Sequence, residues 1–129
     1  MVKETLVEKD ISDGKKLILR LDNSEFKVTS AFWLYTSESE AWFLYLASNY
    51  VDDHNKKRAY EFIQKELLKF DPAIGIPLSS INPVKVNNTY VKLLKTVVFT
   101  EPDTLNEIRL TDVVINGVMI EDALIYRTS

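Results

Sequence analysis

The hydrophobic pattern at the start of the chain is that of a helix. Apolar residues recur at alternating steps of four and three, which places them on one helical face. We therefore expect a helix over residues 3–21, ended by the polar run Asp22-Asn23-Ser24. Gly14 lies within the apolar stripe, where it costs helix stability but allows close packing against a sheet. The stripe consists of Val7, Ile11, Gly14, Ile18 and Leu21.

Two strongly apolar segments follow, over residues 26–36 and 41–48, with the polar loop 37–40 between them. This loop has the length of a hairpin connection. Both segments are apolar on both faces, so we expect two strands that helices or another subunit cover on each side. Alternation divides the first strand between Phe26, Val28, Phe32 and Leu34 on one face and Ala31, Trp33 and Tyr35 on the other.

The middle of the chain predicts two helices and a strand. Asp71-Pro72 ends the first of these helices, because proline disfavours helical backbone in the residue before it. Pro83 restricts its strand to an edge position or to a strand start. Asn87 or Asn88 caps the helix that follows. In chain order we expect a loop over 51–55, a helix over 56–70, a strand over 81–86 and a helix over 89–99.

The segment INGVMIEDALIYR carries the clearest pattern, an Asn116-Gly117 turn between two apolar runs. Asn-Gly readily takes the positive φ angles of a type I′ turn, so we expect a hairpin with strands over 106–114 and 118–127. The order of elements is then helix, hairpin, helix, strand, helix, hairpin. This order predicts one α+β domain over residues 1–129, with a five-stranded, largely antiparallel sheet packed with helices.

A two-residue turn sets the register of the hairpin and so the positions of its charges. Asp112 then lies opposite Glu121, and Thr111 lies opposite Asp122 with Arg109 on the diagonal. We interpret Arg109 and Asp122 as a cross-strand ion pair. Like charges opposite each other destabilise a sheet, so Asp112 and Glu121 share a proton, hold a cation such as Mg²⁺, or lie in solvent or beside a lysine. We favour solvent exposure or a nearby lysine, because a bulge that shifts the register would separate the two acids.

Composition and charge narrow the class of protein. The 129 residues carry a net charge of -3, and the longest basic run, Lys56-Lys57-Arg58, is too short to indicate nucleic-acid binding through phosphates. The lack of cysteine excludes disulfides, thiolate catalysis and cysteine-based zinc sites. No apolar run approaches the roughly 20 residues of a membrane helix, and the charged N-terminus lacks the apolar core of a signal peptide. We therefore expect a soluble, cytoplasmic protein with no membrane partner.

The single histidine lies in the run Asp52-Asp53-His54-Asn55. A carboxylate beside an imidazole can bind a metal or pass a proton. Adjacent side chains seldom point at one ion, however, so we interpret Asp53 or Asn55 as the N-cap of the next helix.

Aromatic residues are concentrated in the two central strands. They either pack in the core, line a ligand pocket or form a dimer interface, since Trp and Tyr are enriched at interfaces. The candidates for a pocket or an interface are Trp33, Tyr35, Trp42 and Tyr45.

Five segments carry a resemblance to other sequences: LVEKD with Gly14, the strand AFWLY, the loop Glu38-Ser39-Glu40 before Trp42, the LAS that precedes Val51-Asp52, and INGVMIEDALIYR. Together they resemble a family of small bacterial proteins of uncharacterised function. The resemblance spans nearly the whole chain, and the closing hairpin is its most specific part. It implies one domain and brings no activity, cofactor or catalytic residue.

No catalytic constellation is recognisable in the sequence. Our leading hypothesis is a small non-catalytic interaction or regulatory domain that forms a homodimer or binds another protein, without a cofactor. The alternative is a metal-dependent hydrolase or nuclease, in which Asp112 and Glu121, with Asp122, hold Mg²⁺. A third hypothesis is a small-ligand sensor with an aromatic pocket between sheet and helix.

Overall fold

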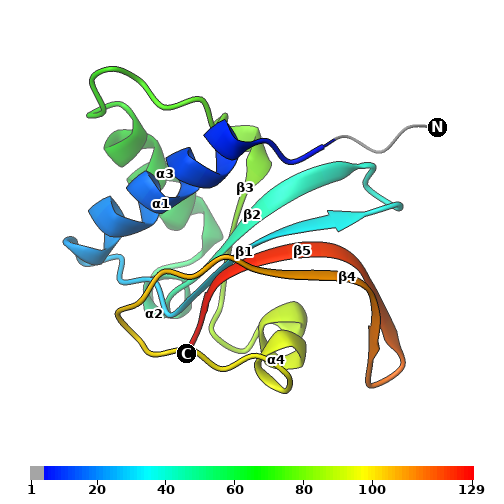
Figure 1. Cartoon of the computed structure of the whole chain (residues 1–129). Helices are drawn as coiled ribbons and strands as arrows, with labels where there is room; N and C mark the ends of the chain where they lie inside the picture. Colours follow the sequence, from blue (N-terminus) through cyan, green and yellow to red (C-terminus); the bar gives the residue numbers. More distant parts are fainter. Residues whose placement is uncertain (1–4) are drawn as a thin grey trace.

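The computed structural model describes residues 5–129, which form a five-stranded mixed sheet with helices on both faces (Figure 1). The predicted α+β class and the predicted order of elements are confirmed. The elements are α1 (Glu8–Asp22), β1 (Ser30–Thr36), β2 (Ala41–Ala47), α2 (Asn49–Asp53), α3 (Lys56–Leu67), a 3₁₀ turn η1 (Leu78–Ser80), β3 (Ile81–Val84), α4 (Thr89–Lys95), β4 (Ile108–Ile115) and β5 (Val118–Thr128).

The strands lie in the order β3-β2-β1-β5-β4. Neighbouring strands are antiparallel except β2 and β3, which are parallel. The parallel pair arises because α2 and α3 carry the chain from the end of β2 back to the start of β3, as in a crossover connection. Pro83 lies in an edge strand as predicted, where its missing N–H leaves no gap in the sheet.

Several predicted boundaries are wrong by a few residues. Residues 3 and 4 of the first predicted helix lie outside the described residues, and α1 itself begins at Glu8, because the backbone of Val7 is extended. Helices α3 and α4 end earlier than predicted, at Leu67 and Lys95. The short helix α2 replaces part of the predicted loop 51–55.

Ser48 is the N-cap of α2, since its side-chain hydroxyl accepts a hydrogen bond from the Tyr50 N–H at 3.1 Å. Strand β1 begins at Ser30, four residues later than predicted. Phe26 and Val28 therefore precede the strand and do not follow its alternation. Both pack with α1, on the opposite face from Phe32.

Among the described residues, no helix has the length and apolar character needed to span a bilayer.

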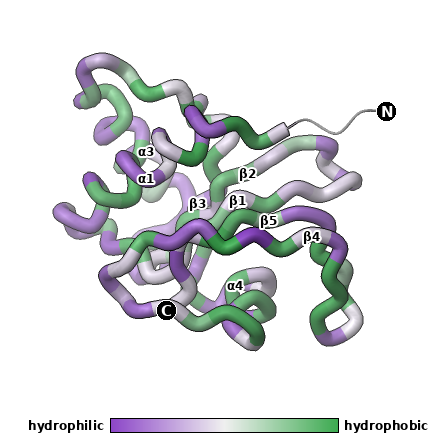
Figure 2. Tube along the Cα trace, in the orientation of Figure 1, coloured by the Kyte–Doolittle hydropathy of each residue, from purple (hydrophilic) through white to green (hydrophobic). Residues whose placement is uncertain are grey.

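The sheet separates two apolar clusters, visible as green segments on either side of it (Figure 2). The larger cluster joins α1, α2 and α3 to the sheet, and the smaller joins α4 and the tip of the last hairpin to the other face. Central strands apolar on both faces, which the sequence predicts, are therefore explained by helices within this chain. The large, fully buried members include Leu17, Ile18, Leu21, Phe26, Leu44, Leu46, Ile63, Ile81 and Tyr126 in the first cluster and Phe32 and Leu94 in the second.

Helix α1 approaches the sheet closely at Gly14. The hydroxyl of Tyr126, on β5, donates a hydrogen bond to the carbonyl of Ile11 at 2.8 Å and accepts one from the indole Nε1 of Trp33 at 2.9 Å. A Cβ at Gly14 would overlap this hydroxyl. Burial raises the pKa of Tyr126 far above its ordinary value, so the hydroxyl stays protonated. The glycine expected to allow close packing is thus the position at which the tyrosine reaches the helix.

A bulge in β5 directs two consecutive side chains toward α1. Ala31 pairs with Arg127 and Phe32 pairs with Ile125, which leaves Tyr126 as the extra residue. The Tyr126 hydroxyl donates a hydrogen bond to the Ile11 carbonyl in the first half of α1. The Arg127 guanidinium donates to the carboxylate of Asp22, the last residue of α1. The bulge therefore connects the last strand to the first half of α1 and to its C-terminal end.

Asp13 connects α1 to the loop before β3, and its side chain is only 4% exposed. Its carboxylate accepts hydrogen bonds from the Lys9 ammonium at 2.8 Å and from the Gly75 N–H at 2.9 Å. Burial alone would raise the pKa of Asp13, but these bonds outweigh it and hold the pKa below its ordinary value. A carboxylate with a lowered folded pKa stabilises the protein above its unfolded pKa and loses that contribution as pH falls.

We therefore expect Asp13→Asn to lower the free energy of unfolding by about 1–2 kcal/mol at pH 7. The difference from wild type should shrink below about pH 4, where the unfolded carboxyl takes up its proton. Urea denaturation at pH 7 and pH 3 measures both values. Asp10→Asn, on the same turn of the helix, is the matched control and should change little. A difference that is independent of pH would contradict the assignment.

Candidate functional site

The closing hairpin has the predicted turn and register. Ile115 pairs with Val118 and Val113 pairs with Ile120. Asn116 and Gly117 have φ angles of 49° and 79°, as a type I′ turn requires. The two-residue connection is therefore confirmed.

Arg109 and Asp122 form the predicted cross-strand ion pair. Arg109 donates from Nε to one carboxylate oxygen at 2.6 Å and from Nη2 to the other at 2.7 Å. The guanidinium lies over the ring of Trp42, 5.5 Å from its centroid. Hydrogen bonding to Asp122 raises the pKa of Arg109 despite partial burial. Asp122 is 2% exposed, so this pair fastens β4 to β5 and does not present a free carboxylate.

Asp112 and Glu121 are the two acids that remain. The hydrogen-bonded ladder is present on both sides of them but is interrupted at this position, where Asp112 has a left-handed φ of 52°. Glu121 turns to the loop between β1 and β2 and accepts a hydrogen bond from the Ser37 N–H at 2.6 Å. Among residues 5–129, no group of three His, Cys, Asp or Glu side chains is placed to hold a metal ion.

The interruption at Asp112 also changes which side chains face the core. In a regular strand Ile120 and Ala123 would lie on opposite faces, yet both belong to the cluster beneath α4. The end of the hairpin consequently bends toward the α4 side of the sheet (Figure 1). This bend was not predicted, although aspartate tolerates left-handed backbone better than most residues.

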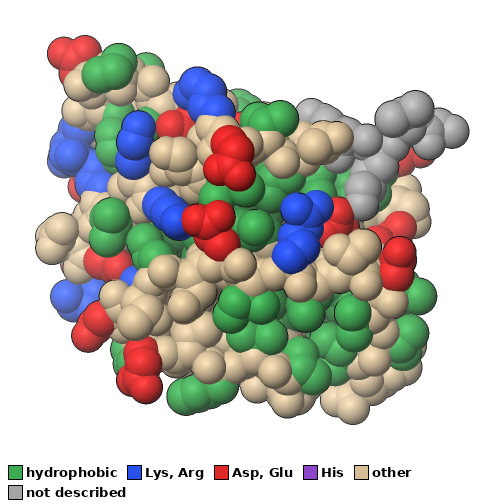
Figure 3. All heavy atoms as spheres, in the orientation of Figure 1, with side chains coloured by type: hydrophobic (Ala, Val, Ile, Leu, Met, Phe, Trp, Pro, Cys, Tyr) green, Lys and Arg blue, Asp and Glu red, His purple; other side chains and the backbone are tan. Residues whose placement is uncertain are grey.

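Aliphatic side chains lie exposed at the end of this hairpin. Val114 and Met119 are cross-strand partners, and their exposed fractions are 60% and 51%. Val118 is 38% exposed beside them. We call Val114, Val118 and Met119 the hairpin patch. Hydrophobic side chains gather over this part of the molecule, below a row of charged ones (Figure 3).

The histidine run has structural roles. The side chain of Asn55 caps α3 by accepting a hydrogen bond from the Arg58 N–H at 2.9 Å, as one of the two predicted caps. The ring of His54 stacks on Tyr50 at 4.0 Å. Asp52 accepts a hydrogen bond from the backbone of Val86 at 3.3 Å. These side chains diverge and do not converge on a common point.

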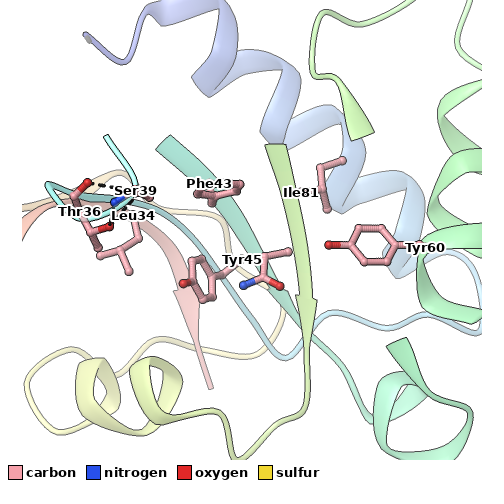
Figure 4. Close-up of a pocket in the computed structure, with 8 residues that line it drawn as sticks. Leu34, Thr36, Ser39, Phe43, Tyr45, Tyr60 and Ile81 are labelled. Carbon is pink, nitrogen blue, oxygen red and sulfur yellow. Dashed lines mark hydrogen bonds between the residues drawn. The ribbon is translucent and has the colours of Figure 1, made fainter. Parts of the chain in front are cut away.

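The four candidate aromatic residues are divided between core and cavity. Trp33, Tyr35 and Trp42 are 3%, 7% and 7% exposed and pack against the α1 side of the sheet. Tyr45 lies on the other face and stacks on Phe32 at 5.0 Å. Of the four, Tyr45 alone lines a cavity described here (Figure 4).

This cavity lies where β3 begins, between the β1–β2 hairpin and α3, and has a volume of about 310 Å³. It exists because β3 pairs with β2 only from Leu44 onward, which leaves the first part of β2 without a neighbour on that side. Of its lining residues only Tyr45 is among the four candidates that the aromatic pattern of the sequence indicates, since the walls come from four separate elements. The principal lining residues are Leu34, Phe43, Tyr45, Tyr60, Ile81 and Asn82.

The polar groups of the cavity are uncharged. Burial raises the pKa of Tyr45, although hydrogen bonding with the Asn82 side chain opposes this effect. Burial likewise raises the pKa of Tyr60. Both phenols therefore keep their protons at neutral pH. At the rim, the hydroxyls of Thr36 and Ser39 are hydrogen bonded to each other at 2.8 Å.

No family model, curated protein or solved structure matches the chain. The resemblance to small bacterial proteins stays a prediction. The geometry of the hairpin and of the cavity is therefore the basis for assigning a function.

Proposed function

We propose that this chain is a small non-catalytic interaction domain that self-associates through the hairpin patch and the adjoining edge of β4. The observation that carries the proposal is the exposed cross-strand pair of Val114 and Met119. Exposed aliphatic side chains that adjoin one another mark interaction surfaces more often than scattered ones do. The core aromatics are not needed for this surface.

The edge of β4 adds backbone groups to the surface. In a two-residue hairpin the residues that flank the turn bond each other, so Ile115 and Val113 direct their backbone groups toward β5. Val114 and Leu110 then direct theirs outward, because these groups alternate along a strand. β4 is the last strand of the sheet, and an edge of this kind readily accepts another strand.

A second copy of this chain is the partner that the edge fits best. Two identical edge strands pair antiparallel about a two-fold axis, which closes the assembly at a dimer. Arg109 is the one basic residue of β4, and it is bonded to Asp122. It therefore does not prevent another strand from pairing with this edge, as a free lysine would. The left-handed Asp112 divides the edge into two short stretches, which limits pairing with unrelated strands.

The hydrolase hypothesis has less support in the geometry. The Glu121 carboxylate is bonded to a loop amide, and Asp122 is bonded to Arg109. Asp112 is left as an exposed carboxylate at a bend. We therefore propose that the hairpin serves in binding and not in catalysis.

Sedimentation equilibrium over a range of protein concentrations tests the proposal. We expect wild type to dimerise and Met119→Lys to weaken the dimer by at least about tenfold, because a lysine is costly to desolvate at an apolar contact. The matched control is Leu68→Lys, which alters a side chain 75% exposed at the end of α3 and should leave the dimer unchanged. A strictly monomeric wild type at the highest concentration would sink the proposal, as would an equal effect of both variants.

A further inference from the structure

The cavity beside β3 has the size and the walls of a binding site for a small molecule. Its volume of about 310 Å³ lies at the lower end of the range for ligand pockets. Phe43 contributes an aromatic ring that stacks on no other ring among the described residues. Leu34 and Ile81 form aliphatic parts of the wall, although each is almost fully buried. A ligand here is therefore small and has an apolar face.

The charges around the cavity indicate an uncharged ligand. Among residues 5–129, no acidic or basic side chain lines it. The Lys56 ammonium donates to Oδ1 of Asn82, a lining residue, at 2.5 Å and is thereby engaged. A charged group in a half-enclosed site would lose hydration without gaining a partner of opposite charge.

The hydrogen-bonding groups indicate hydroxyls on the ligand. Tyr60 extends from α3 toward β3 with its hydroxyl leading, and that hydroxyl has no hydrogen-bond partner among residues 5–129 (Figure 4). The Asn82 amide is already engaged, because its Oδ1 accepts from Lys56 and its side chain hydrogen bonds with Tyr45, so it is poorly placed to pair with the donor and acceptor of a nucleobase edge. Phenol hydroxyls both donate and accept, which matches the same dual capacity of ligand hydroxyls.

We propose that this cavity binds an uncharged, hydroxyl-bearing ring of monosaccharide size. The ring packs its apolar face on Phe43, while its hydroxyls bond the phenols of Tyr45 and Tyr60. The site is separate from the hairpin patch, and the proposal goes beyond self-association.

Protein-observed NMR titration is the test, with methyl glucoside, methyl galactoside and N-acetylglucosamine as probes at up to about 10 mM. At least one probe should shift the ring resonances of Phe43, Tyr45 and Tyr60 in a saturable manner. Tyr60→Phe should weaken that binding by about fivefold, since it removes one hydrogen bond and little shape. Tyr50→Phe is the matched control, because this half-buried tyrosine lies outside the cavity and its loss should not change the affinity.

Three outcomes would overturn the assignment. The first is that none of the three sugars shifts these rings. The second is stronger binding of uridine or adenosine in the same cavity, which would assign it to a nucleobase. The third is stronger binding of glucuronate or glucose 6-phosphate, which would show that a charge is accommodated. Met119→Lys should bind the sugar as wild type does, so failure of self-association and failure of this site are distinguishable.

Discussion

Replacing Arg127 with leucine is expected to lower the free energy of unfolding by about 4 kcal/mol or more, a large share of the stability of a domain this size. The Arg127 side chain is 1% exposed. Its guanidinium donates to both carboxylate oxygens of Asp22, at 3.1 and 3.0 Å. It also donates to the carbonyl oxygens of Val28 and Thr104, each at 2.9 Å. Leucine leaves all of these acceptors without their donor.

Two further variants test whether the several donors of the Arg127 guanidinium, and not its charge alone, provide this stability. Arg127→Lys keeps the charge but offers one point of donation, so it should recover only part of the loss. Arg20→Leu removes an arginine from an ion pair with Glu66, in which the arginine side chain is 38% exposed, and should cost about 1 kcal/mol or less. Chemical denaturation monitored by circular dichroism provides the comparison. If Arg127→Leu costs no more than Arg20→Leu, the desolvation of Arg127 offsets its hydrogen bonds and our account is wrong.

Arg127 also shows where prediction from the sequence stops. The turn at Asn116-Gly117 determines the register by local backbone chemistry, and Arg109 and Asp122 follow from that register by counting. Arg127 lies in the same strand, but its partners depend on a bulge and on the end of α1. A bulge displaces one residue at little local cost, so neighbouring side chains give no sign of it.

The same distinction explains one feature of the sheet that the sequence does not predict, the direction of β3, and one that it predicts wrongly, the face of Phe26. The sequence predicts a strand over residues 81–86, of which 81–84 form β3. The direction in which this strand pairs depends on the path of α2 and α3 across the sheet. The face on which Phe26 packs depends on where β1 begins. Both are set by contacts between distant segments, which a pattern of apolar residues does not contain.

The two candidate sites also differ in whether they depend on local or on distant segments of the chain. The hairpin patch lies within one local element, and its apolar residues are visible in the sequence once the turn is recognised. The cavity is formed by Phe43 and Tyr45 of β2, Tyr60 of α3 and Asn82 of β3, which come together only because β3 is short. Of these wall residues, Tyr45 alone is among the four candidates that the aromatic pattern of the sequence predicts.

The contact between Gly14 and Tyr126 leads to the second large predicted effect, the loss of stability in Gly14→Ala. This loss should depend on whether residue 126 carries a hydroxyl. On a free helix, Gly→Ala stabilises by about 1 kcal/mol. At Gly14, however, the new methyl group overlaps the Tyr126 hydroxyl, and overpacking of a core typically costs 1–3 kcal/mol. We therefore expect Gly14→Ala to destabilise the wild type by about 2 kcal/mol. Ser12→Ala, at an exposed position of the same helix, should be neutral or slightly stabilising.

Tyr126→Phe should itself cost about 2 kcal/mol, because the buried indole N–H of Trp33 loses its acceptor. In that background Gly14→Ala no longer meets a hydroxyl, and its cost should fall by at least about 1 kcal/mol. Some cost should remain, since the methyl carbon would still lie 3.0 Å from Cζ and 3.2 Å from Cε2 of the ring. A double-mutant cycle by urea denaturation measures this coupling. Additive effects would mean that the helix shifts to accommodate the methyl group, and that the close approach at Gly14 is not required by the hydroxyl of Tyr126.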